Sequence, residues 1–371
     1  MSAQQRYSTE RRDTSRSTTG FVTRPIGQES GSNELRSKHE FFSVLRSREA
    51  TQPVKVLITG GAGFIGANLV RSLDQTPGFG AVIVLDDFSA GFRKNLVGTR
   101  ATILEGSILD ENLLDHAFEQ VSAVVHLAAR SSVPLSITNP MATHEANSTG
   151  TARVLEAARR AGNVHVIMAS SSSVYGATTD LPKHEALPTR PVSPYAASKL
   201  AAEAYTLAWS HSYGLPALAL RFFNVFGPLQ SPTHAYAAVI PAFLSSALRG
   251  LPLPVHGDGT QCRDFTFVDT VVEVLIGALD RRLTHPEPVN LAFGSRIRLL
   301  DVISRLEQVL DRKLPVDFHP PRTGDVQQSQ ADPSLLRELF PGTEPTTLLA
   351  GLEKTADWFS RERPWEPGET G

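Results

Sequence analysis

Short apolar runs recur along the chain between residues 54 and 221, separated by polar and glycine-containing segments. Runs of this length, rich in Val, Ile and Leu, are typical of strands buried on both faces. They predict strands at 54–59, 81–86, 101–105, 122–128, 164–169 and 216–221. Between them, apolar residues follow a helical period near 64–74, 110–119, 142–161 and 194–212. This alternation predicts an α/β fold: a doubly wound parallel sheet with helices on both faces.

The regular alternation ends near Asn224, and the sequence beyond it contains many prolines and shorter apolar runs. We expect a smaller C-terminal α/β domain there, closing over the carboxyl ends of the strands, where ligands bind in such sheets. The first domain is expected at 51–224, completed by about 266–292, and the second at 225–265 and 293–371. Residues 1–50 are expected to form a disordered tail and a short amphipathic helix near 39–48.

The first predicted strand runs directly into a glycine-rich turn, Thr-Gly-Gly-Ala-Gly-Phe-Ile-Gly, at 59–66. Between a strand and a helix, Gly60 permits the tight turn, Gly63 the close approach of a pyrophosphate and Gly66 the helix–strand contact. The helix N-terminus then favours the anion. The second strand ends at Asp86, whose carboxylate suits a ribose 2′-hydroxyl and repels a 2′-phosphate. The pattern predicts a Rossmann-type domain that binds NAD rather than NADP.

Composition narrows the range of partners. The formal net charge is −2, which favours neither nucleic acid nor an anionic membrane surface as a partner. With Cys262 as the one cysteine, neither an intrachain disulfide nor a cysteine-built metal site can form. No apolar run is long enough to span a membrane, and the N-terminus lacks the apolar core of a signal peptide. We therefore expect a cytoplasmic protein without a metal site, in which a lone histidine such as His126 is structural.

Tyr195 and Lys199 lie four residues apart in a predicted helix, so the phenol and the ammonium share one helix face. Such pairs are common on solvated helices, but this one follows the fifth predicted strand, downstream of the cofactor turn. The ammonium and a positive nicotinamide ring would lower the pKa of the tyrosine from about 10 and make it a usable base. At the end of the fifth strand, Ser171 within Ala-Ser-Ser-Ser-Ser-Val-Tyr-Gly could relay the proton of a substrate hydroxyl.

Several motifs, including those already described, follow one another along the chain in the order seen in a known family. They are Gly60–Gly66, His126-Leu-Ala-Ala129, Ser170–Gly176, Tyr195–Lys199, Arg221–Pro228, Tyr236–Pro241, Gly257-Asp-Gly259 with Arg263-Asp264, and Arg322-Thr-Gly-Asp325. From about Val54 to Trp358 the chain resembles the extended short-chain dehydrogenase/reductase family, in its NAD-dependent nucleotide-sugar 4-epimerase branch.

The resemblance implies a role for each matching residue. Ser171, Tyr195 and Lys199 match the catalytic residues of the family. The positions expected to bind NAD are Gly60, Gly63, Phe64, Ile65, Gly66, Asp86, Ser107, Ile108, Leu127, Ala128, Ala129, Tyr195, Lys199 and Phe222. The positions expected to bind the UDP-sugar are Ser132, Ser171, Ser172, Ser173, Asn224, Val239, Leu253, His256, Arg263, Arg322, Asp325 and Ser329. The guanidinium groups of Arg263 and Arg322 suit a nucleotide diphosphate.

The serines before Val-Tyr-Gly bear on the reaction. In the family, dehydratases have an Asp-Glu pair there and decarboxylases an acid, whereas this chain has Ser172 and Ser173, which do not shuttle protons as carboxylates do. Inversion at C4 of a UDP-hexose needs no such group. The resemblance also implies that the residue at position 329 borders the sugar, where a bulky side chain excludes N-acetyl groups. Ser329 is small and permits an N-acetylated sugar without selecting it, so we expect UDP-N-acetylglucosamine and UDP-N-acetylgalactosamine as substrates.

Several alternatives stay open. UDP-glucose or UDP-glucuronate could be the substrate, and a dehydratase, a decarboxylase or a non-catalytic nucleotide-sugar sensor could use the same scaffold. Ser107, Leu135 and His256 depart from the usual pattern of the family and leave room for an unusual nucleotide sugar. The resemblance also implies a homodimer that joins the helices near 142–161 and 194–212.

Overall fold

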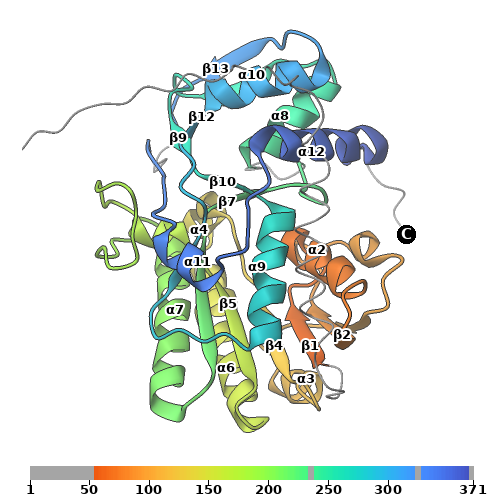
Figure 1. The fold of residues 1–371 in the computed structure, drawn as a ribbon, viewed down its shortest axis with the longest axis vertical. Coiled ribbons are helices and arrows are strands. Elements are labelled where there is room, and N and C mark those ends of the chain that lie inside the picture. The colour runs from red at the N-terminus through yellow and green to blue at the C-terminus, as the bar shows by residue number, and fades with distance from the viewer. Residues whose placement is uncertain (1–53, 233–237, 322–326, 367–371) are drawn as a thin grey trace, which may run out of the picture. The chain divides into compact units, whose positions relative to one another are not determined.

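A parallel sheet of seven strands forms the centre of the fold (Figure 1). The computed structural model describes residues 54–232, 238–321 and 327–366, so the predicted tail and the helix near 39–48 lie outside the described residues. The strand order is β11-β6-β5-β4-β1-β2-β3, and all neighbours are parallel. The strands are β1 (Val54–Thr59), β2 (Phe79–Asp86), β3 (Thr102–Glu105), β4 (Ala123–His126), β5 (His165–Ser171), β6 (Ala217–Phe222) and β11 (Val289–Leu291).

The apolar pattern located this sheet well. The six predicted strands are confirmed, and the predicted doubly wound α/β fold with them. The seventh strand, β11, was not predicted as a strand, because three residues are too short for an apolar run to stand out. The strand order reverses between β1 and β4, and ligands bind at such a switch point in doubly wound sheets.

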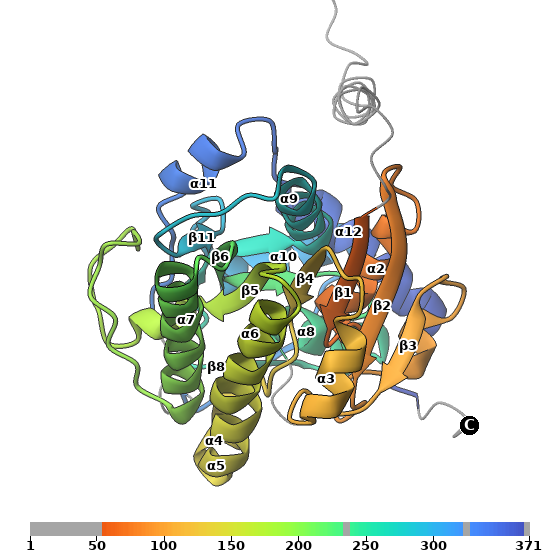
Figure 2. The ribbon, with the colours of Figure 1, turned by 90° about the horizontal axis from the view of Figure 1, so that it is seen from below.

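Helices cover both faces of the sheet (Figure 2). On one face lie α2 (Phe64–Leu73) and α9 (Val268–Arg281), and on the other α3 (Glu111–Ala117), α6 (Gly150–Arg160) and α7 (Pro194–Tyr213). Because side chains alternate along a strand, Val56 and Ile58 of β1 enter the first core and Leu57 enters the second. Burial of strands on both faces explains their nearly continuous apolar sequences.

The helix predicted at 142–161 is interrupted. The chain forms α4 (Val133–Thr138), α5 (Pro140–His144), a π-helical turn at Glu145–Thr149 and then α6. Within the π turn, Asn147 accepts from Arg130 N over 2.7 Å and donates to Arg130 O over 3.0 Å and to Ser198 Oγ over 2.9 Å. These bonds fix the loop after β4 against α7. A single apolar period does not reveal such a turn, because it depends on partners distant in sequence.

Apart from the helix at Ser334–Leu339, which lies beside the sheet, the C-terminal elements lie above it in Figure 1. Three two-stranded sheets, β7–β10, β8–β13 and β9–β12, are flanked by helices. The elements are β7 (Asn224–Phe226), α8 (Val239–Leu248), β8 (Leu253–His256), β9 (Cys262–Arg263), β10 (Phe265–Phe267), β12 (Ile297–Arg298), α10 (Leu299–Leu310), β13 (Val316–His319), α11 (Ser334–Leu339) and α12 (Leu348–Glu362). After Asn224 the chain thus forms short strands and helices, and its division into two domains stays a prediction.

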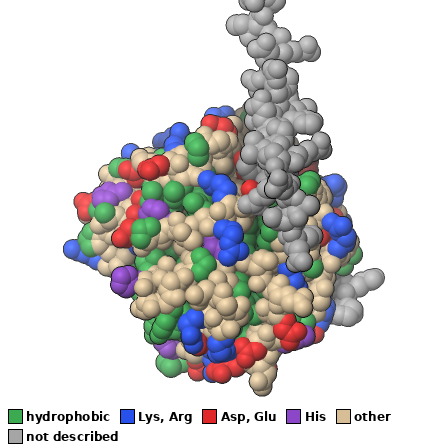
Figure 3. Space-filling model, turned by 60° about the horizontal axis from the view of Figure 1, so that its bottom comes forward, with side chains coloured by type: hydrophobic (Ala, Val, Ile, Leu, Met, Phe, Trp, Pro, Cys, Tyr) green, Lys and Arg blue, Asp and Glu red, His purple; other side chains and the backbone are tan. Residues whose placement is uncertain are grey.

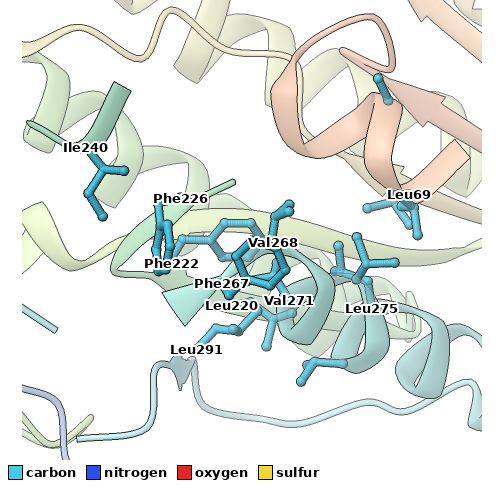
Figure 4. Packing of buried hydrophobic residues seen from close by; sticks show 14 of the residues in the cluster. Leu69, Leu220, Phe222, Phe226, Ile240, Phe267, Val268, Val271, Leu275 and Leu291 are labelled. Atoms are coloured by element: carbon cyan, nitrogen blue, oxygen red, sulfur yellow. The ribbon is translucent and has the colours of Figure 1, made fainter. Parts of the chain in front are cut away.

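One apolar cluster joins these elements to the sheet. Figure 4 shows Phe222, at the end of β6, close to Phe226 and Phe267 of the β7–β10 pair. The rings of Phe226 and Phe267 meet edge to face at 5.5 Å, a favourable geometry for aromatic pairs. A side chain at Gly351 of α12 would lie 2.7 Å from the Phe226 ring, so helix and ring are in close contact. The packing holds the C-terminal elements beside the carboxyl ends of the strands.

The surface drawn in Figure 3 carries acidic and basic side chains intermixed. In the part of the chain that the structure describes, no helix is long and apolar enough to cross a membrane.

Candidate functional site

The glycine-rich turn between β1 and α2 is tightly packed. Gly60 has φ +72°, and a Cβ there would lie 2.7 Å from Ala128 N in the loop after β4. A Cβ on Gly66 would lie 2.4 Å from Gly60 O. Gly63 begins α2 without any side-chain cap, so the first N–H groups of the helix are free for an anion. These observations fit the pyrophosphate of a dinucleotide.

Asp86 supports the same turn from the end of β2. Its carboxylate accepts from Ala62 N and from Phe88 N, each over 2.9 Å. The side chain is buried, and burial raises the pKa of Asp86 above its usual range, against the lowering effect of the two backbone bonds. Each oxygen keeps a lone pair for a ribose hydroxyl. The geometry therefore suits the predicted role of Asp86.

The other predicted cofactor positions lie along the carboxyl edge of the sheet. Leu127, Ala128 and Ala129 follow β4, and Leu127 N donates to Thr59 O over 3.0 Å. Ser107 and Ile108 follow β3, and Phe222 ends β6. Phe64 and Ile65 form the first turn of α2. The fold thus brings the predicted positions to one edge, and the residues present fit NAD.

Tyr195 is oriented by the start of α7. Ser193 caps this helix by accepting from Ala196 N over 3.1 Å, and Pro194 occupies the first turn, where its missing N–H costs nothing. The Tyr195 phenol lies near the hydroxyls of Ser171 and Ser173, which both act to lower its pKa. Ser171 ends β5, and Ser173 lies in the 3-10 turn η4 (Ser172–Tyr175), within hydrogen-bonding distance of Ser171 Oγ. The structure therefore brings together the predicted tyrosine and two serines.

The expected lowering of the Tyr195 pKa is not produced by the protein groups alone. Burial raises the pKa of Tyr195, and the hydrogen bonds from Ser171 and Ser173 oppose this only in part. The physical reason is that burial disfavours the charged phenolate. The expected lowering of the Tyr195 pKa also depended on the positive nicotinamide ring of NAD, whose charge is not among these protein groups.

Lys199 lies one helical turn beyond Tyr195 and is buried. Burial lowers the pKa of Lys199 to about 8, while the negative charge of Glu203 acts in the opposite direction. The ammonium is therefore the main form at neutral pH, with deprotonation beginning only slightly above it.

His126, at the end of β4, is a structural histidine. Its ring nitrogens bond Thr59 Oγ1 over 2.7 Å and Thr151 Oγ1 over 2.9 Å. Burial, together with the nearby charge of Lys199, lowers the pKa of His126 to about 3, so the ring is neutral. It ties β1, β4 and α6 together beneath the site.

Sequence reasoning missed a buried charge pair behind Lys199. Glu203 of α7 and Arg221 of β6 form a two-pronged ion pair, with Nη2 2.7 Å from Oε1 and Nε 3.0 Å from Oε2. Burial acts to lower the pKa of Arg221, but the hydrogen bonds and the negative charge of Glu203 raise it above its usual value, so Arg221 keeps its proton. The available signal was a glutamate four residues after Lys199, on a buried face of a helix rich in alanine.

Two of the predicted sugar-binding residues border the sheet. Ser132 caps α4 and accepts from Leu135 N over 3.2 Å. Asn224 begins β7, and both its backbone N and its Nδ2 donate to Asp264 O, over 3.1 and 3.3 Å. Asp264 in turn accepts from Gly294 N, Ser295 Oγ and Ala331 N. The C-terminal segments are thereby fixed around Asn224.

The remaining predicted sugar-binding residues belong to the C-terminal elements. Arg263 Nη1 and Ser329 N both donate to Cys262 O, over 2.9 and 3.1 Å, so Arg263 and Ser329 are neighbours. Val239 begins α8. The side chain of Leu253 is fully buried, which leaves only its backbone for a ligand. Arg322 and Asp325 lie outside the described residues.

His256 ends β8 and stacks on His319 of β13, with ring centroids 5.1 Å apart and planes at 29°. Beside this pair lies an open hollow of about 630 Å³, lined by Gly257, Asp258, Phe318, His319, Pro321 and Gln327. The described ranges, this hollow included, contain no group of three or more His, Cys, Asp or Glu side chains placed to hold a metal ion.

Comparison with known proteins decides the family. A model described as the NAD dependent epimerase/dehydratase family matches residues 56–292. The chain belongs to this family. Membership makes it an NAD-dependent enzyme of the epimerase/dehydratase class, in agreement with the fit of the glycine turn and Asp86 to NAD.

Relatives from this family resemble nearly all of the described chain. A UDP-glucose 4-epimerase of Mycolicibacterium smegmatis is 35% identical over 82% of this chain and 98% of its own length. The structure of a UDP-N-acetylglucosamine 4-epimerase from Methanobrevibacter ruminantium M1, in complex with UDP-N-acetylmuramic acid, is 33% identical with a TM-score of 0.79, over 84% of this chain and 100% of that one. A UDP-glucuronic acid 4-epimerase from Bacillus cereus, with UDP-glucuronic acid and NAD, is 28% identical with a TM-score of 0.75, over 83% and 100%.

Proposed function

We propose that the protein is a UDP-sugar 4-epimerase that interconverts UDP-N-acetylglucosamine and UDP-N-acetylgalactosamine. The observation that carries the proposal is the contact of the Tyr195 phenol with Ser171 and Ser173, one helical turn from Lys199 and at the carboxyl edge of an NAD-binding sheet. The similar proteins described above act at the same carbon on three different sugars, which supports the reaction class more strongly than the choice of sugar.

The chain's own groups suffice for proton transfer at one carbon. Tyr195 takes the proton of the sugar's C4 hydroxyl, directly or through Ser171, and returns it after the ring has turned over. Bound NAD supplies the complementary chemistry, the removal of hydride from C4 and its return to the other face of the 4-keto sugar. The described protein groups alone do not lower the pKa of Tyr195, so the positive charge of Lys199, on the same helix face, would favour the ionised phenol together with the nicotinamide ring of bound NAD.

The absence of a second acid in the serine segment, defined as residues 170–175, supports epimerisation over dehydration. Residues 171–173 are all serine. The carboxylate that does contact this segment, Glu203, already accepts bonds from Ser170 and Arg221. Being buried and paired, it is poorly placed to exchange a proton with a sugar.

The choice of an N-acetylated sugar rests on Ser329. Its backbone N donates to Cys262 O, as Arg263 Nη1 does, and a side chain as small as that of serine would not exclude an acetamido group. A pocket that accommodates the larger sugar can also admit a smaller one, so glucose and glucuronate derivatives are the direct competitors to test.

The proposal is tested by incubating the purified full chain separately with UDP-N-acetylglucosamine, UDP-glucose and UDP-glucuronate, first without and then with added NAD. Proton NMR of the anomeric region distinguishes each sugar from its 4-epimer. We expect conversion of UDP-N-acetylglucosamine to be fastest. Faster turnover of another sugar would overturn the choice of substrate, and unchanged spectra for all three would overturn the reaction. A parallel preparation of Tyr195→Phe identifies any contaminating activity.

We further propose a homodimer formed through α6 and α7. Ala197, Ala204, Tyr205 and Ala208 lie exposed along α7, and small residues allow helices to approach closely. Leu135, Ile137 and Met141 of α4 and α5 add apolar surface, each being more than half exposed. Because α4 and α5 both pack on α7, these exposed apolar side chains lie on neighbouring helices, as is typical of an interface.

Ala204→Glu would place a charge in the centre of this interface and is expected to yield monomers, because a buried unpaired charge is costly. Size-exclusion chromatography with light scattering measures the change. Ser304→Glu, on the exposed side of α10, is the matched control and should stay dimeric. A wild-type chain that elutes as a monomer would contradict the proposal.

A further inference from the structure

The serine segment is held at both ends by the buried pair Glu203–Arg221. At its start, Ser170 Oγ donates to Glu203 Oε2 over 2.6 Å. At its end, Tyr175 Oη accepts from Arg221 Nη1 over 2.9 Å and donates to Asn290 Oδ1 of β11 over 2.7 Å. Between these two anchored residues lie Ser171 and Ser173, which contact the Tyr195 phenol. Any movement of the pair would therefore be transmitted to both serines.

Strand register strengthens this coupling. In the β5–β6 pair, Ser170 lies opposite Arg221 and Ser171 opposite Phe222. Glu203 lies on α7, which packs across the same strands. The carboxylate thus joins three elements at one point, directly behind the site: the end of β5, the end of β6 and the middle of α7.

Glu203 also acts on Lys199. Tyr195, Lys199 and Glu203 follow at intervals of four residues on α7 and so share one helix face. The negative charge of Glu203 raises the pKa of Lys199, which burial lowers. From β4, neutral His126 faces the same ammonium, and from β6, Arg221 faces Glu203. Among the described residues that act on Lys199, Glu203 is the one that favours its charged form.

Stability alone gives little reason for such a pair. Desolvation of two buried charges offsets much of their attraction, and apolar residues of similar volume stabilise a fold as well or better. Here the carboxylate of Glu203 accepts from Ser170 at one end of the serine segment, and the guanidinium of Arg221 donates to Tyr175 at the other end. This arrangement favours a role in the geometry of the site.

We propose that Glu203 is a positioning residue for proton transfer at Tyr195: together with Arg221 it fixes the serine segment beside the phenol. The inference rests on the proposed function, since Tyr195 is the group that Glu203 serves. Glu203 acts through Ser170 and Lys199, and its effect should appear in kcat and in pH dependence rather than in KM.

Ser170→Ala tests the mechanical part and leaves the ion pair intact. We expect kcat to fall about tenfold, as for loss of one well-placed hydrogen bond in the transition state, with KM nearly unchanged. Independently of any sugar, tyrosinate absorbance measures the ionisation of Tyr195 as the difference between a protein and its Tyr195→Phe counterpart. In Ser170→Ala the phenol should ionise at higher pH, because the serine bonds that favour its charged form are loosened.

Glu203→Gln tests the electrostatic part. Without the negative charge, Lys199 should lose its proton at lower pH, so the alkaline limb of the kcat profile should move down by about one unit. Ser170→Ala should leave that limb in place. Thr206→Ala is the matched control: it removes another buried hydroxyl of α7, one that bonds only its own helix at Ala202 O. Its kcat and pH profile should match those of the wild type.

The proposal would be overturned if folded Ser170→Ala had the kcat and the tyrosine titration of the wild type. It would also be overturned if Thr206→Ala lost as much kcat as Ser170→Ala. If Glu203→Gln does not fold, Ser170→Ala still decides the matter. If the wild type converts none of the sugars, the proposed function fails, while the tyrosine titration continues to report whether the serine segment depends on Ser170.

Discussion

Tyr195→Phe is expected to lower kcat by about 10²–10⁴-fold, the usual contribution of a general acid–base group. The substitution removes a single oxygen, the phenol oxygen on which Ser171 and Ser173 act. The ring keeps its place in the first turn of α7, which is fixed by the Ser193 cap. The fold and NAD binding should therefore persist.

The pH dependence gives this prediction its sign. In the wild type, activity should rise with pH as Tyr195 loses its proton. Burial raises the pKa of Tyr195, and Ser171 and Ser173 oppose this only in part, so burial moves the rise in activity to higher pH. In Tyr195→Phe the remaining activity should lack that limb. Initial rates measured by NMR across a pH series report both effects. Tyr213→Phe is the control, because that phenol is 51% exposed at the last residue of the same helix, about five turns from Tyr195, and its kcat should match that of the wild type. Retention of a tenth or more of wild-type kcat in Tyr195→Phe would assign the base elsewhere.

Gly66→Ala is expected to disrupt the cofactor turn. The new Cβ would lie 2.4 Å from Gly60 O and 2.7 Å from Gly61 Cα, and both are backbone atoms that cannot rotate away. Forcing the helix from the strand should lower the free energy of unfolding by about 1–3 kcal/mol. It also moves the N–H groups that would face the pyrophosphate, so NAD affinity should fall at least about tenfold, or about 1.4 kcal/mol.

Calorimetric titration with NAD and thermal unfolding with and without NAD measure the two effects of Gly66→Ala. Gly342→Ala is the matched control, since a Cβ there meets no atom within 4 Å. It should bind NAD like the wild type and unfold at a similar temperature. Unchanged NAD affinity in Gly66→Ala would show that the turn is not the pyrophosphate site.

The sequence predicted most where local chemistry decides the structure. Buried parallel strands need nearly continuous apolar runs, so β1 to β6 were visible as such. The spacing of Tyr195 and Lys199 placed both on one helix face without further information. The glycine turn was likewise predictable, because its residue types follow from its backbone geometry.

Features that depend on distant partners were not predictable in this way. The π turn around Asn147 exists through bonds to Arg130 and Ser198, and β11 is a strand because β6 pairs with it. Glu203 and Arg221 are eighteen residues apart in sequence, and their pairing needs the register of β5, β6 and α7. The pKa of Tyr195 could not be judged correctly without its burial.

The placement of β11 has a consequence for how the chain is made. The sheet uses residues 54–222 and then 289–291, and α9 (residues 268–281) covers one of its faces. During synthesis, therefore, the strands of the sheet emerge well before the helix that shields them and the strand that closes their edge. Domains usually fold in the order in which they leave the ribosome, but here the covering helix α9 and the edge strand β11 come late. A nascent chain that ends before residue 268 would leave the apolar side chains that pack against α9, such as Ile167 of β5 and Leu220 of β6, without that cover, and such a surface is suited to transient protection by a chaperone.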